Sequence, residues 1–269
     1  MRLVASDLDG TIVGHQGEIS ARTLRAFKDC SAAGVDIVFV TGRPPRWLGP
    51  LREQLRHHGT VICSNGALTY DLGTETVVSS HLLEPGRILD SRDIIRSLYP
   101  AATFAVETIT GFHVEPGFAE PGSAELLGGA RPMPFEQSLP GEQVVKFLAR
   151  EHDIHPDEFL ETVRPAIAHL VSTTHSAPSV ALLEMAPPHV NKAVALAEYA
   201  RARGILAADV VAFGDMPNDI QMLAWAGQGY AMASGHPSAR SAANLEAPSF
   251  AQDGVARVLE ARLAALRAV

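Results

Sequence analysis

The chain alternates between short runs of apolar residues and longer segments in which apolar residues recur at helical spacing. The apolar runs are rich in Val, Ile, Ala and Phe, and they end in small or polar residues. Five such runs cover residues 3–6, 35–40, 61–63, 210–213 and 229–232. Continuous apolar runs are typical of strands in a parallel sheet, because helices cover both faces of such a sheet. The five runs therefore predict a buried parallel sheet.

Segments with one apolar face separate these runs and predict helices. The first is expected to begin after Ser20, whose side chain can accept a hydrogen bond from an unpaired amide of the first helical turn. The others are expected to begin at Pro44 or Pro45, at Asn191 or Lys192, at Asn218 and at Gly254. Strands that alternate with helices of this length predict an α/β fold with a doubly wound parallel sheet.

The middle of the chain follows a different pattern, in which apolar and polar residues alternate. Alternation is typical of antiparallel strands that have one buried and one open face. We expect strands at residues 104–108, 111–115, 144–148 and 180–185, and helices at residues 89–98 and 157–170. These elements predict an α+β domain whose antiparallel sheet is covered by two helices on one face.

Two proline-containing pairs flank this middle segment. We expect Pro85-Gly86 and Pro187-Pro188 to act as hinges, because proline and glycine interrupt regular structure. The chain is thereby predicted to contain two domains. Residues 1–82 and 187–269 would form the α/β core, and residues 83–186 would form an α+β domain inserted into it.

Composition and charge argue against several classes of partner. The formal net charge is −8 over 269 residues, so we do not expect a nucleic-acid partner. No apolar run approaches the roughly 20 residues of a membrane span, so no membrane association is expected. Cys30 and Cys63 lie in apolar surroundings and do not suggest a disulfide framework. We expect a cytoplasmic protein that is a monomer or a small homo-oligomer.

Polar residues gather where the predicted strands of the core end. They are Asp7 and Asp9 after the first strand, Thr41 after the second, Asn65 after the third, and Asp215 and Asp219 after the fourth. Doubly wound sheets bind ligands at the carboxyl ends of their strands, so we expect these side chains at one site. Four carboxylates repel each other unless a cation is bound, and oxygen ligands favour Mg²⁺ together with a substrate phosphate.

Lys192 would supply a second positive charge to this site, between a carboxylate and an incoming phosphoryl oxygen. Each signal also has an ordinary structural interpretation. Thr41-Gly42 alone is typical of a turn that ends a strand, and Asn65-Gly66 alone is typical of a type I′ turn. Their occurrence together at the strand ends favours a functional site.

The same residues form four motifs that resemble those of the haloacid dehalogenase superfamily of phosphohydrolases, and in particular its Cof-type branch. The motifs are Asp7-Leu8-Asp9-Gly10-Thr11, Thr41-Gly42-Arg43, Lys192, and Gly214-Asp215 through Asn218-Asp219, and the segment Ser64-Asn65-Gly66-Ala67 is also similar. Asn191 stands where a serine often precedes the lysine, and Pro217 replaces a polar residue of the acidic turn. The resemblance implies a Rossmann-like core with a large C2-type cap inserted between the second and third motifs.

The resemblance also implies catalytic roles. Asp7 would be the nucleophile that forms an aspartyl-phosphate. Asp9 would protonate the leaving oxygen and later deprotonate the attacking water. Thr41, Gly42 and Lys192 would hold phosphoryl oxygens. The same resemblance implies a Mg²⁺ site formed by Asp7, the Asp9 carbonyl, Asp215 and Asp219, the last as a direct ligand or as a support for the others. Asn65 and Asn218 would contact the substrate phosphate, with Lys192 as an alternative partner of Asn218.

These implications predict a Mg²⁺-dependent phosphatase that acts on a small phosphorylated metabolite, with sugar phosphates as a candidate class. The cap would select the substrate. A phosphomutase or phosphotransferase would use the same aspartyl-phosphate and stays an alternative. A non-catalytic protein that binds phosphorylated metabolites is a third alternative, but it would not need Asp7, Asp9 and Lys192, all of which are present.

Overall fold

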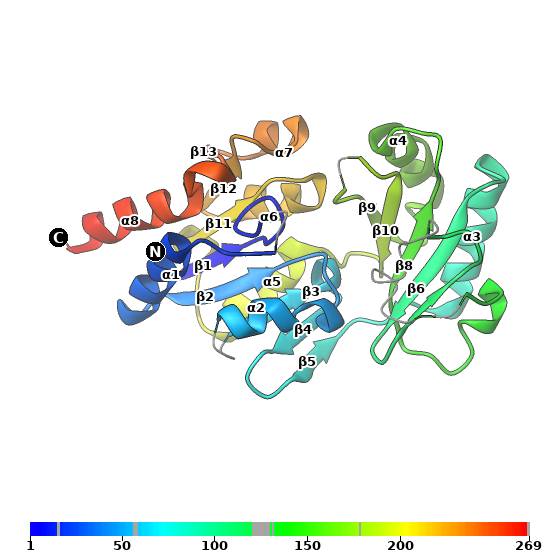
Figure 1. Ribbon diagram of the computed structural model, residues 1–269, viewed down its shortest axis with the longest axis horizontal. Coiled ribbons are helices and arrows are strands. Elements are labelled where there is room, and N and C mark those ends of the chain that lie inside the picture. Colours follow the sequence, from blue (N-terminus) through cyan, green and yellow to red (C-terminus); the bar gives the residue numbers. More distant parts are fainter. Residues whose placement is uncertain (15–16, 56–58, 120–129, 131, 178, 268–269) are drawn as a thin grey trace. The chain divides into compact units, whose positions relative to one another are not determined.

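The computed structural model describes residues 1–14, 17–55, 59–119, 130, 132–177 and 179–267, which form two compact units (Figure 1). The first, here called the core unit, comprises Met1–Ser79 and Asn191–Val269. The second, here called the inserted unit, comprises Ser80–Val190. Each unit contains its own cluster of buried apolar side chains.

An eight-stranded sheet forms the centre of the core unit, with the strand order β13-β12-β11-β1-β2-β3-β4-β5. The strands are β1 (Leu3–Ser6), β2 (Asp36–Val40), β3 (Thr60–Cys63), β4 (Leu68–Asp71), β5 (Thr76–Ser80), β11 (Val210–Gly214), β12 (Gln228–Met232) and β13 (Leu245–Ala247). The strands from β13 to β3 are parallel, whereas β4 pairs antiparallel with β3. The predicted α/β fold with a doubly wound parallel sheet is confirmed.

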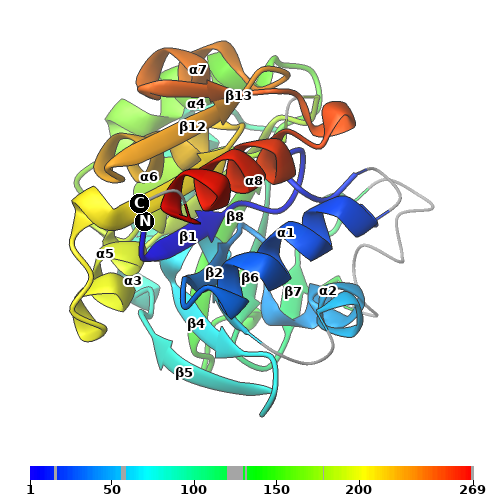
Figure 2. The same ribbon diagram turned by 90° about the vertical axis from the view of Figure 1, so that its left-hand side faces the viewer.

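Helices cover both faces of this sheet (Figure 2). They are α1 (Ala21–Ala32), α2 (Gly49–Gln54), α5 (Lys192–Ala202), α6 (Ile220–Trp225), α7 (Pro237–Ala242) and α8 (Gly254–Arg267). Alternate side chains of a strand point to opposite faces. Val38 accordingly packs in the cluster that contains Leu196 of α5, whereas the next residue, Phe39, meets Phe27 of α1 edge-on at a ring distance of 5.3 Å. This two-sided burial explains the continuous apolar runs.

The inserted unit contains a five-stranded antiparallel sheet with the order β7-β6-β8-β10-β9. Its elements are α3 (Pro85–Leu98), β6 (Thr103–Thr108), β7 (Phe112–Val114), β8 (Val144–Arg150), α4 (Pro156–Ile167), β9 (Ser172–Thr174) and β10 (Leu182–Ala186). Ile88 of α3 and Phe159 of α4 pack in one cluster with Phe147 and Leu183 of the sheet. The antiparallel strand pattern and the covered face are as the sequence predicts.

The expected hinge at Pro85-Gly86 is wrong. Both residues lie in the first turn of α3, so this helix begins four residues before the predicted start at residue 89. Proline is well suited to the first position of a helix, because that position needs no amide hydrogen and proline fixes a helical φ. A pattern of apolar residues alone misses this first turn.

Candidate active site

The carboxyl ends of four neighbouring parallel strands bring the residues of the sequence motifs together. The strands lie in the order β11, β1, β2, β3. Asp215, Asp7 and Thr41 directly follow the first three, and Asn65 is the second residue after β3. All four side chains are buried. In the sheet, β1 lies between β2, the next strand along the chain, and β11, which comes much later in the chain. The strand order thus reverses direction at β1, and open α/β sheets bind ligands at such a topological switch point.

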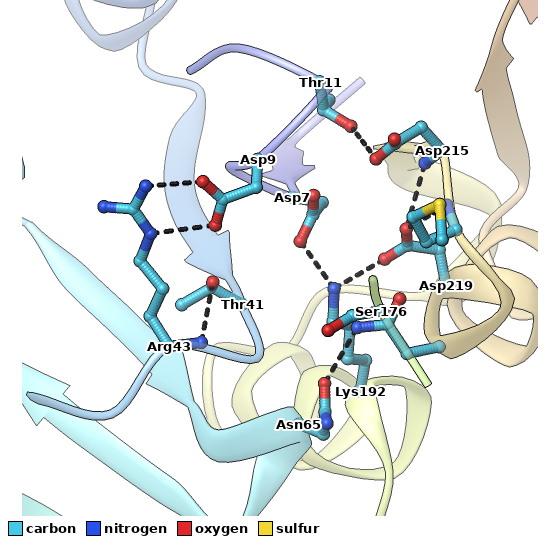
Figure 3. Close-up of polar contacts among 12 residues, drawn as sticks. Asp7, Asp9, Thr11, Thr41, Arg43, Asn65, Ser176, Lys192, Asp215 and Asp219 are labelled. Atoms are coloured by element: carbon cyan, nitrogen blue, oxygen red, sulfur yellow. Dashed lines mark hydrogen bonds and ion pairs between the residues drawn. The ribbon is translucent and has the colours of Figure 1, made fainter. Parts of the chain in front are cut away.

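Lys192 lies between two carboxylates at this edge of the sheet (Figure 3). Its Nζ donates a hydrogen bond of 2.5 Å to Oδ1 of Asp7 and one of 2.7 Å to Oδ1 of Asp219. Lys192 is the first residue of α5, and the Asn191 side chain caps this helix by accepting a 3.0 Å bond from the amide of Val194. The Asn191 side chain thus provides the cap that fixes the start of the helix.

Burial changes the proton affinity of these groups. Removal from water opposes the charge on Lys192, but the carboxylates of Asp219 and Asp7 outweigh it and raise the pKa of the ammonium group. The pKa of Asp7 is raised well above its usual range by burial above all, which outweighs the attraction of Lys192, and by repulsion from Asp219 and Asp215. One lysine therefore does not balance the three buried carboxylates.

Asp219 and Asp215 differ in what their oxygens contact. Oδ2 of Asp219 accepts hydrogen bonds from the amides of Asp215 and Met216 at 2.9 and 3.0 Å, and its Oδ1 faces Lys192. Both oxygens of Asp219 thus hold parts of the protein in place. Asp215 accepts a 3.0 Å bond from the Thr11 hydroxyl through Oδ1, and burial with repulsion from Asp219 raises its pKa to about 7.

The buried carboxylates fit a divalent cation. Asp7, Asp215 and Asp219 each offer an oxygen, and these atoms lie within 4.8 Å of one another. Lys192 and Thr11 donate their hydrogen bonds to Oδ1 of Asp7 and of Asp215 respectively. Oδ2 of each residue can therefore serve as a ligand for a hard cation such as Mg²⁺. Gly10 keeps this space open, because a Cβ atom at this position would lie 2.3 Å from Oδ2 of Asp215. The engaged oxygens of Asp219 favour a supporting role for that residue.

Asp9 points to a different partner from that of Asp7 (Figure 3). Its two oxygens accept hydrogen bonds from Nε and Nη2 of Arg43 at 2.8 and 2.5 Å. The side chain of Asp9 is 56% exposed, whereas Asp7 is buried. The hydrogen bonds to Asp9 raise the pKa of Arg43.

Thr41 and Gly42 form the bend that follows β2. Thr41 is fully buried, and its hydroxyl accepts a 3.0 Å bond from the amide of Arg43. Its carbonyl accepts a 3.0 Å bond from the amide of Asn65, which ties this bend to the segment after β3. A hydroxyl that accepts one bond can still donate its hydrogen, so the position suits the predicted contact of Thr41 with a phosphoryl oxygen.

Asn65 and Asn218 contact each other. Nδ2 of Asn218 donates a 3.0 Å bond to Oδ1 of Asn65, and both side chains are buried. Asn65 has a left-handed backbone with φ 56°, between Ser64 at 50° and Gly66 at 104°. Positive φ at Asn65 and Gly66 is typical of a type I′ turn, and this turn connects β3 to antiparallel β4. The predicted contact of both asparagines with phosphate stays a prediction.

Replacing Gly66 with alanine tests the packing of this turn against α5. A Cβ atom at Gly66 would lie 2.5 Å from the carbonyl oxygen of Asn191, the residue that caps α5 before Lys192. We expect Gly66→Ala to lower the free energy of unfolding by about 2–4 kcal/mol, the sum of backbone strain at positive φ and steric overlap. We also expect kcat to fall, since Lys192 would move with the start of the helix.

Gly34→Ala is the matched control for this substitution. Gly34 also has a positive φ, of +80°, but a Cβ atom there would meet no other atom within 4 Å. The free energy of unfolding of this variant should therefore fall by only about 1 kcal/mol, the cost of backbone strain, and the variant should keep full activity. Urea unfolding of both variants measures the difference, and equal losses would contradict the proposed contact between the turn and α5.

Two contacts in this site involve motif residues to which the sequence assigned no role. Thr11 bonds Asp215, and Arg43 bonds Asp9. Both residues lie within the quoted motifs, but the loops that bring them to their partners have no periodic pattern. The signal that could have found Arg43 is charge, because an arginine so close to a cluster of acids needs a partner.

The chain matches a known family over most of its length. Residues 4–259 match the model of the haloacid dehalogenase-like hydrolases. The chain belongs to this family. The resemblance found in the sequence, including that to the Cof-type branch, is confirmed, and so is the expectation of a hydrolase.

Relatives of this haloacid dehalogenase-like hydrolase match it over nearly its whole length. A 5-amino-6-(5-phospho-D-ribitylamino)uracil phosphatase of Bacillus subtilis is 27% identical over 96% of each chain. A pyridoxal phosphate phosphatase of Escherichia coli is 25% identical over 97% of this chain and 98% of its own. A solved structure from Streptococcus mutans shares the fold with a TM-score of 0.84 and 23% identity, over 98% of this chain and 99% of that one. These phosphatases support the predicted class, a phosphoric monoester hydrolase.

Proposed function

We propose that the protein is a Mg²⁺-dependent phosphatase that hydrolyses a small phosphorylated metabolite through an aspartyl-phosphate on Asp7. The observation that carries this proposal is the buried group of Asp7, Lys192 and Asp215 at the switch point of the sheet. A nucleophilic carboxylate beside a fixed ammonium group suits attack on a phosphoryl group, because the ammonium group offsets the repulsion between two anions. Membership of the hydrolase family agrees with this chemistry.

The first displacement would transfer the phosphoryl group to Asp7. Oδ2 of Asp7 is assigned to the metal site, so Oδ1, which Lys192 holds, is the oxygen assigned to the attack on phosphorus. A bond forms between this oxygen and phosphorus while the bond from phosphorus to the leaving oxygen breaks. Asp9 donates its proton to the leaving oxygen, which departs as an alcohol. Lys192 and Thr41 hold phosphoryl oxygens during this step.

The second displacement would release phosphate. A water molecule attacks phosphorus, Asp9 takes a proton from that water, and the bond from phosphorus to Asp7 breaks. Asp7 returns to its carboxylate form, and inorganic phosphate leaves. Asp9 regains the proton that it gave up in the first step, so the two steps together consume one water molecule and leave the enzyme unchanged.

Asp7 and Asp215, with the Asp9 carbonyl, are the residues that would hold Mg²⁺. The ion would supply positive charge that favours the ionised form of Asp7 and offsets the charge on the phosphoryl oxygens. Asp219 would support this site by holding Lys192 and the amides after β11.

The substrate is proposed to be a small phosphorylated metabolite. One relative is named for a phosphorylated ribityl compound and another for pyridoxal phosphate, both small phosphate monoesters. We assign residues 83–186 the role of a cap that selects among such substrates, with sugar phosphates as one candidate class.

None of the helices in the described residues is long and apolar enough to cross a membrane. The cytoplasmic location, the oligomeric state and the lack of a nucleic-acid partner stay predictions.

A screen of phosphate monoesters with the purified protein tests this function. We expect p-nitrophenyl phosphate and at least one small metabolite to release inorganic phosphate when Mg²⁺ is present, and not when a chelator replaces it. Formation of an isomeric phosphate ester without free phosphate would instead indicate a phosphomutase. A folded protein that releases phosphate from no ester would overturn the proposal.

Stability should depend on Mg²⁺ in a way that changes with pH. The pKa of Asp215 is about 7 in the folded protein, whereas the ordinary value is 3.8. The folded, metal-free protein therefore binds this proton more tightly than the unfolded chain does, which stabilises the fold at low pH. This contribution to stability is lost as the pH rises from about 4 to about 7. Mg²⁺ requires the ionised carboxylate. We therefore expect Mg²⁺ to raise the Tm more at pH 8 than at pH 5.5.

Thermal unfolding with and without Mg²⁺ at the two pH values measures this effect. Asp215→Asn is the control, since its side chain keeps an oxygen near Thr11 but does not titrate. It should abolish most of the Mg²⁺ effect at pH 8. Equal stabilisation at both pH values would contradict the assignment of Asp215 as a metal ligand.

A further inference from the structure

Arg43 holds Asp9 by both of its carboxylate oxygens (Figure 3). The two donors, Nε and Nη2, belong to one planar guanidinium group, and the two bonds measure 2.8 and 2.5 Å. A bidentate pair of this kind fixes the orientation of a carboxylate as well as its distance. Among the described residues, Arg43 provides the hydrogen bonds to the side chain of Asp9.

The backbone of Arg43 is itself held in place at the site. Its amide donates a 3.0 Å bond to the hydroxyl of Thr41, and its carbonyl accepts a 3.1 Å bond from the amide of Ser64. Its side chain is 20% exposed, less than half the exposure of the Asp9 side chain that it contacts. Arg43 is thus the fixed partner in this pair, and Asp9 is the partner whose orientation depends on the contact.

We propose that Arg43 is a positioning residue that sets the direction in which the Asp9 carboxyl faces the leaving oxygen. This inference rests on the proposed function, in which Asp9 donates a proton in the first displacement and takes one from water in the second. The two bonds from one planar guanidinium fix the plane of the Asp9 carboxyl group. Without them this exposed side chain would be free to rotate away from the leaving oxygen.

A direct contact of Arg43 with the phosphoryl group is the competing interpretation. The two interpretations differ in how the effect of a substitution depends on the leaving group. Proton donation matters more for a basic leaving oxygen than for one that departs readily as an anion. Loss of a phosphoryl contact, in contrast, would lower kcat/KM equally for esters with either kind of leaving oxygen. Phenyl phosphate and p-nitrophenyl phosphate are suitable probes, because they have similar shapes and differ in the basicity of the leaving oxygen.

The test compares kcat/KM for these two esters in the wild-type protein, Arg43→Ala and Arg43→Lys. For Arg43→Ala we expect a loss of about 10-fold to 100-fold with phenyl phosphate and of less than about 3-fold with p-nitrophenyl phosphate. Arg43→Lys should show the same selective loss, because an ammonium group cannot donate to both oxygens in the fixed geometry of a guanidinium. Equal losses for the two esters, or full recovery with lysine, would overturn the inference.

A double-mutant cycle provides a second, independent readout. If Arg43 acts through Asp9, adding Arg43→Ala to Asp9→Asn should cause no further loss of kcat/KM. Additive losses would contradict this coupling. Arg22→Ala is the matched control, since Arg22 forms a similar two-bond pair with Glu260, between α1 and α8, at 2.9 and 2.6 Å. It should leave the activity toward both esters unchanged.

The outcome is distinguishable from a failure of the proposed function. A folded wild-type protein that hydrolyses neither ester with Mg²⁺ present would refute the phosphatase assignment itself. A wild-type protein that hydrolyses both, combined with equal losses in Arg43→Ala, would refute only the role of Arg43. Thermal unfolding of each variant establishes that it is folded before its kinetics are compared.

Discussion

Replacing Asp7 with asparagine is expected to abolish hydrolysis while the fold remains stable. An amide cannot form the aspartyl-phosphate, so we expect kcat to fall by at least about 10⁴-fold. Stability should be kept or increased in the metal-free protein. The reason is that burial and neighbouring acids raise the pKa of Asp7, so its ionised form opposes folding near neutral pH, whereas the amide is uncharged.

Steady-state kinetics and urea unfolding of Asp7→Asn measure the two effects. Asp36→Asn is a suitable control, because Asp36 begins β2 and lies at the opposite end of a strand from the site. It should keep wild-type activity. Substantial turnover by Asp7→Asn would show that another group attacks phosphorus. If Asp7→Asn lost its folded structure together with its activity, the result would indicate a structural role for Asp7 and would contradict the proposal.

Replacing Lys192 with methionine should reduce both activity and stability. The substitution keeps the volume but leaves the carboxylates of Asp7 and Asp219 buried without their shared partner. Breaking a buried ion pair by removing one partner costs about 3–5 kcal/mol. We expect this loss at pH 8 and a smaller one at pH 5, because burial raises the pKa of Asp7, whose carboxylate therefore takes up a proton more readily at the lower pH. Activity should fall by at least about 10³-fold, since the phosphoryl oxygens lose an ammonium group.

A second substitution separates the two effects of Lys192. Adding Asp219→Asn to Lys192→Met removes one of the unbalanced charges, so much of the stability should return while the activity stays low. Lys28→Met, at an exposed position of α1, should change neither property. Urea unfolding at both pH values and kinetics with p-nitrophenyl phosphate measure these outcomes. If the double variant recovered its activity, Lys192 would have no role beyond balancing charge.

The sequence predicts the elements of the core whose strands are buried on both faces. β1, β2, β3, β11 and β12 have continuous apolar runs, and all five are present. The sequence does not predict β9, because Ser172–Thr174 is polar and half-buried and has no apolar pattern. It also does not predict β4, although Asn65-Gly66, a typical hairpin signal, stands before that strand. The pair by itself indicates a turn, and only one of the four residues of β4 is buried.

The sequence also places the acids of the candidate site, because neighbouring parallel strands end at one edge of a sheet. Asp7 and Asp215 follow β1 and β11, which pair directly. The partner of each side chain is less predictable. Arg43 meets Asp9, and Asn218 meets Asn65, through loops whose conformations depend on tertiary contacts. Spacing along the chain does not encode such contacts.

The central claim is the covalent intermediate on Asp7, and trapping it is the most direct test. The protein would be mixed with p-nitrophenyl phosphate and Mg²⁺, quenched in acid within milliseconds, digested, and studied by mass spectrometry. We predict a phosphorylated peptide from the N-terminal strand, with the phosphoryl group on Asp7 and none in Asp7→Asn. Turnover without any phosphorylated peptide, or with the phosphoryl group on another residue, would contradict a covalent intermediate on Asp7.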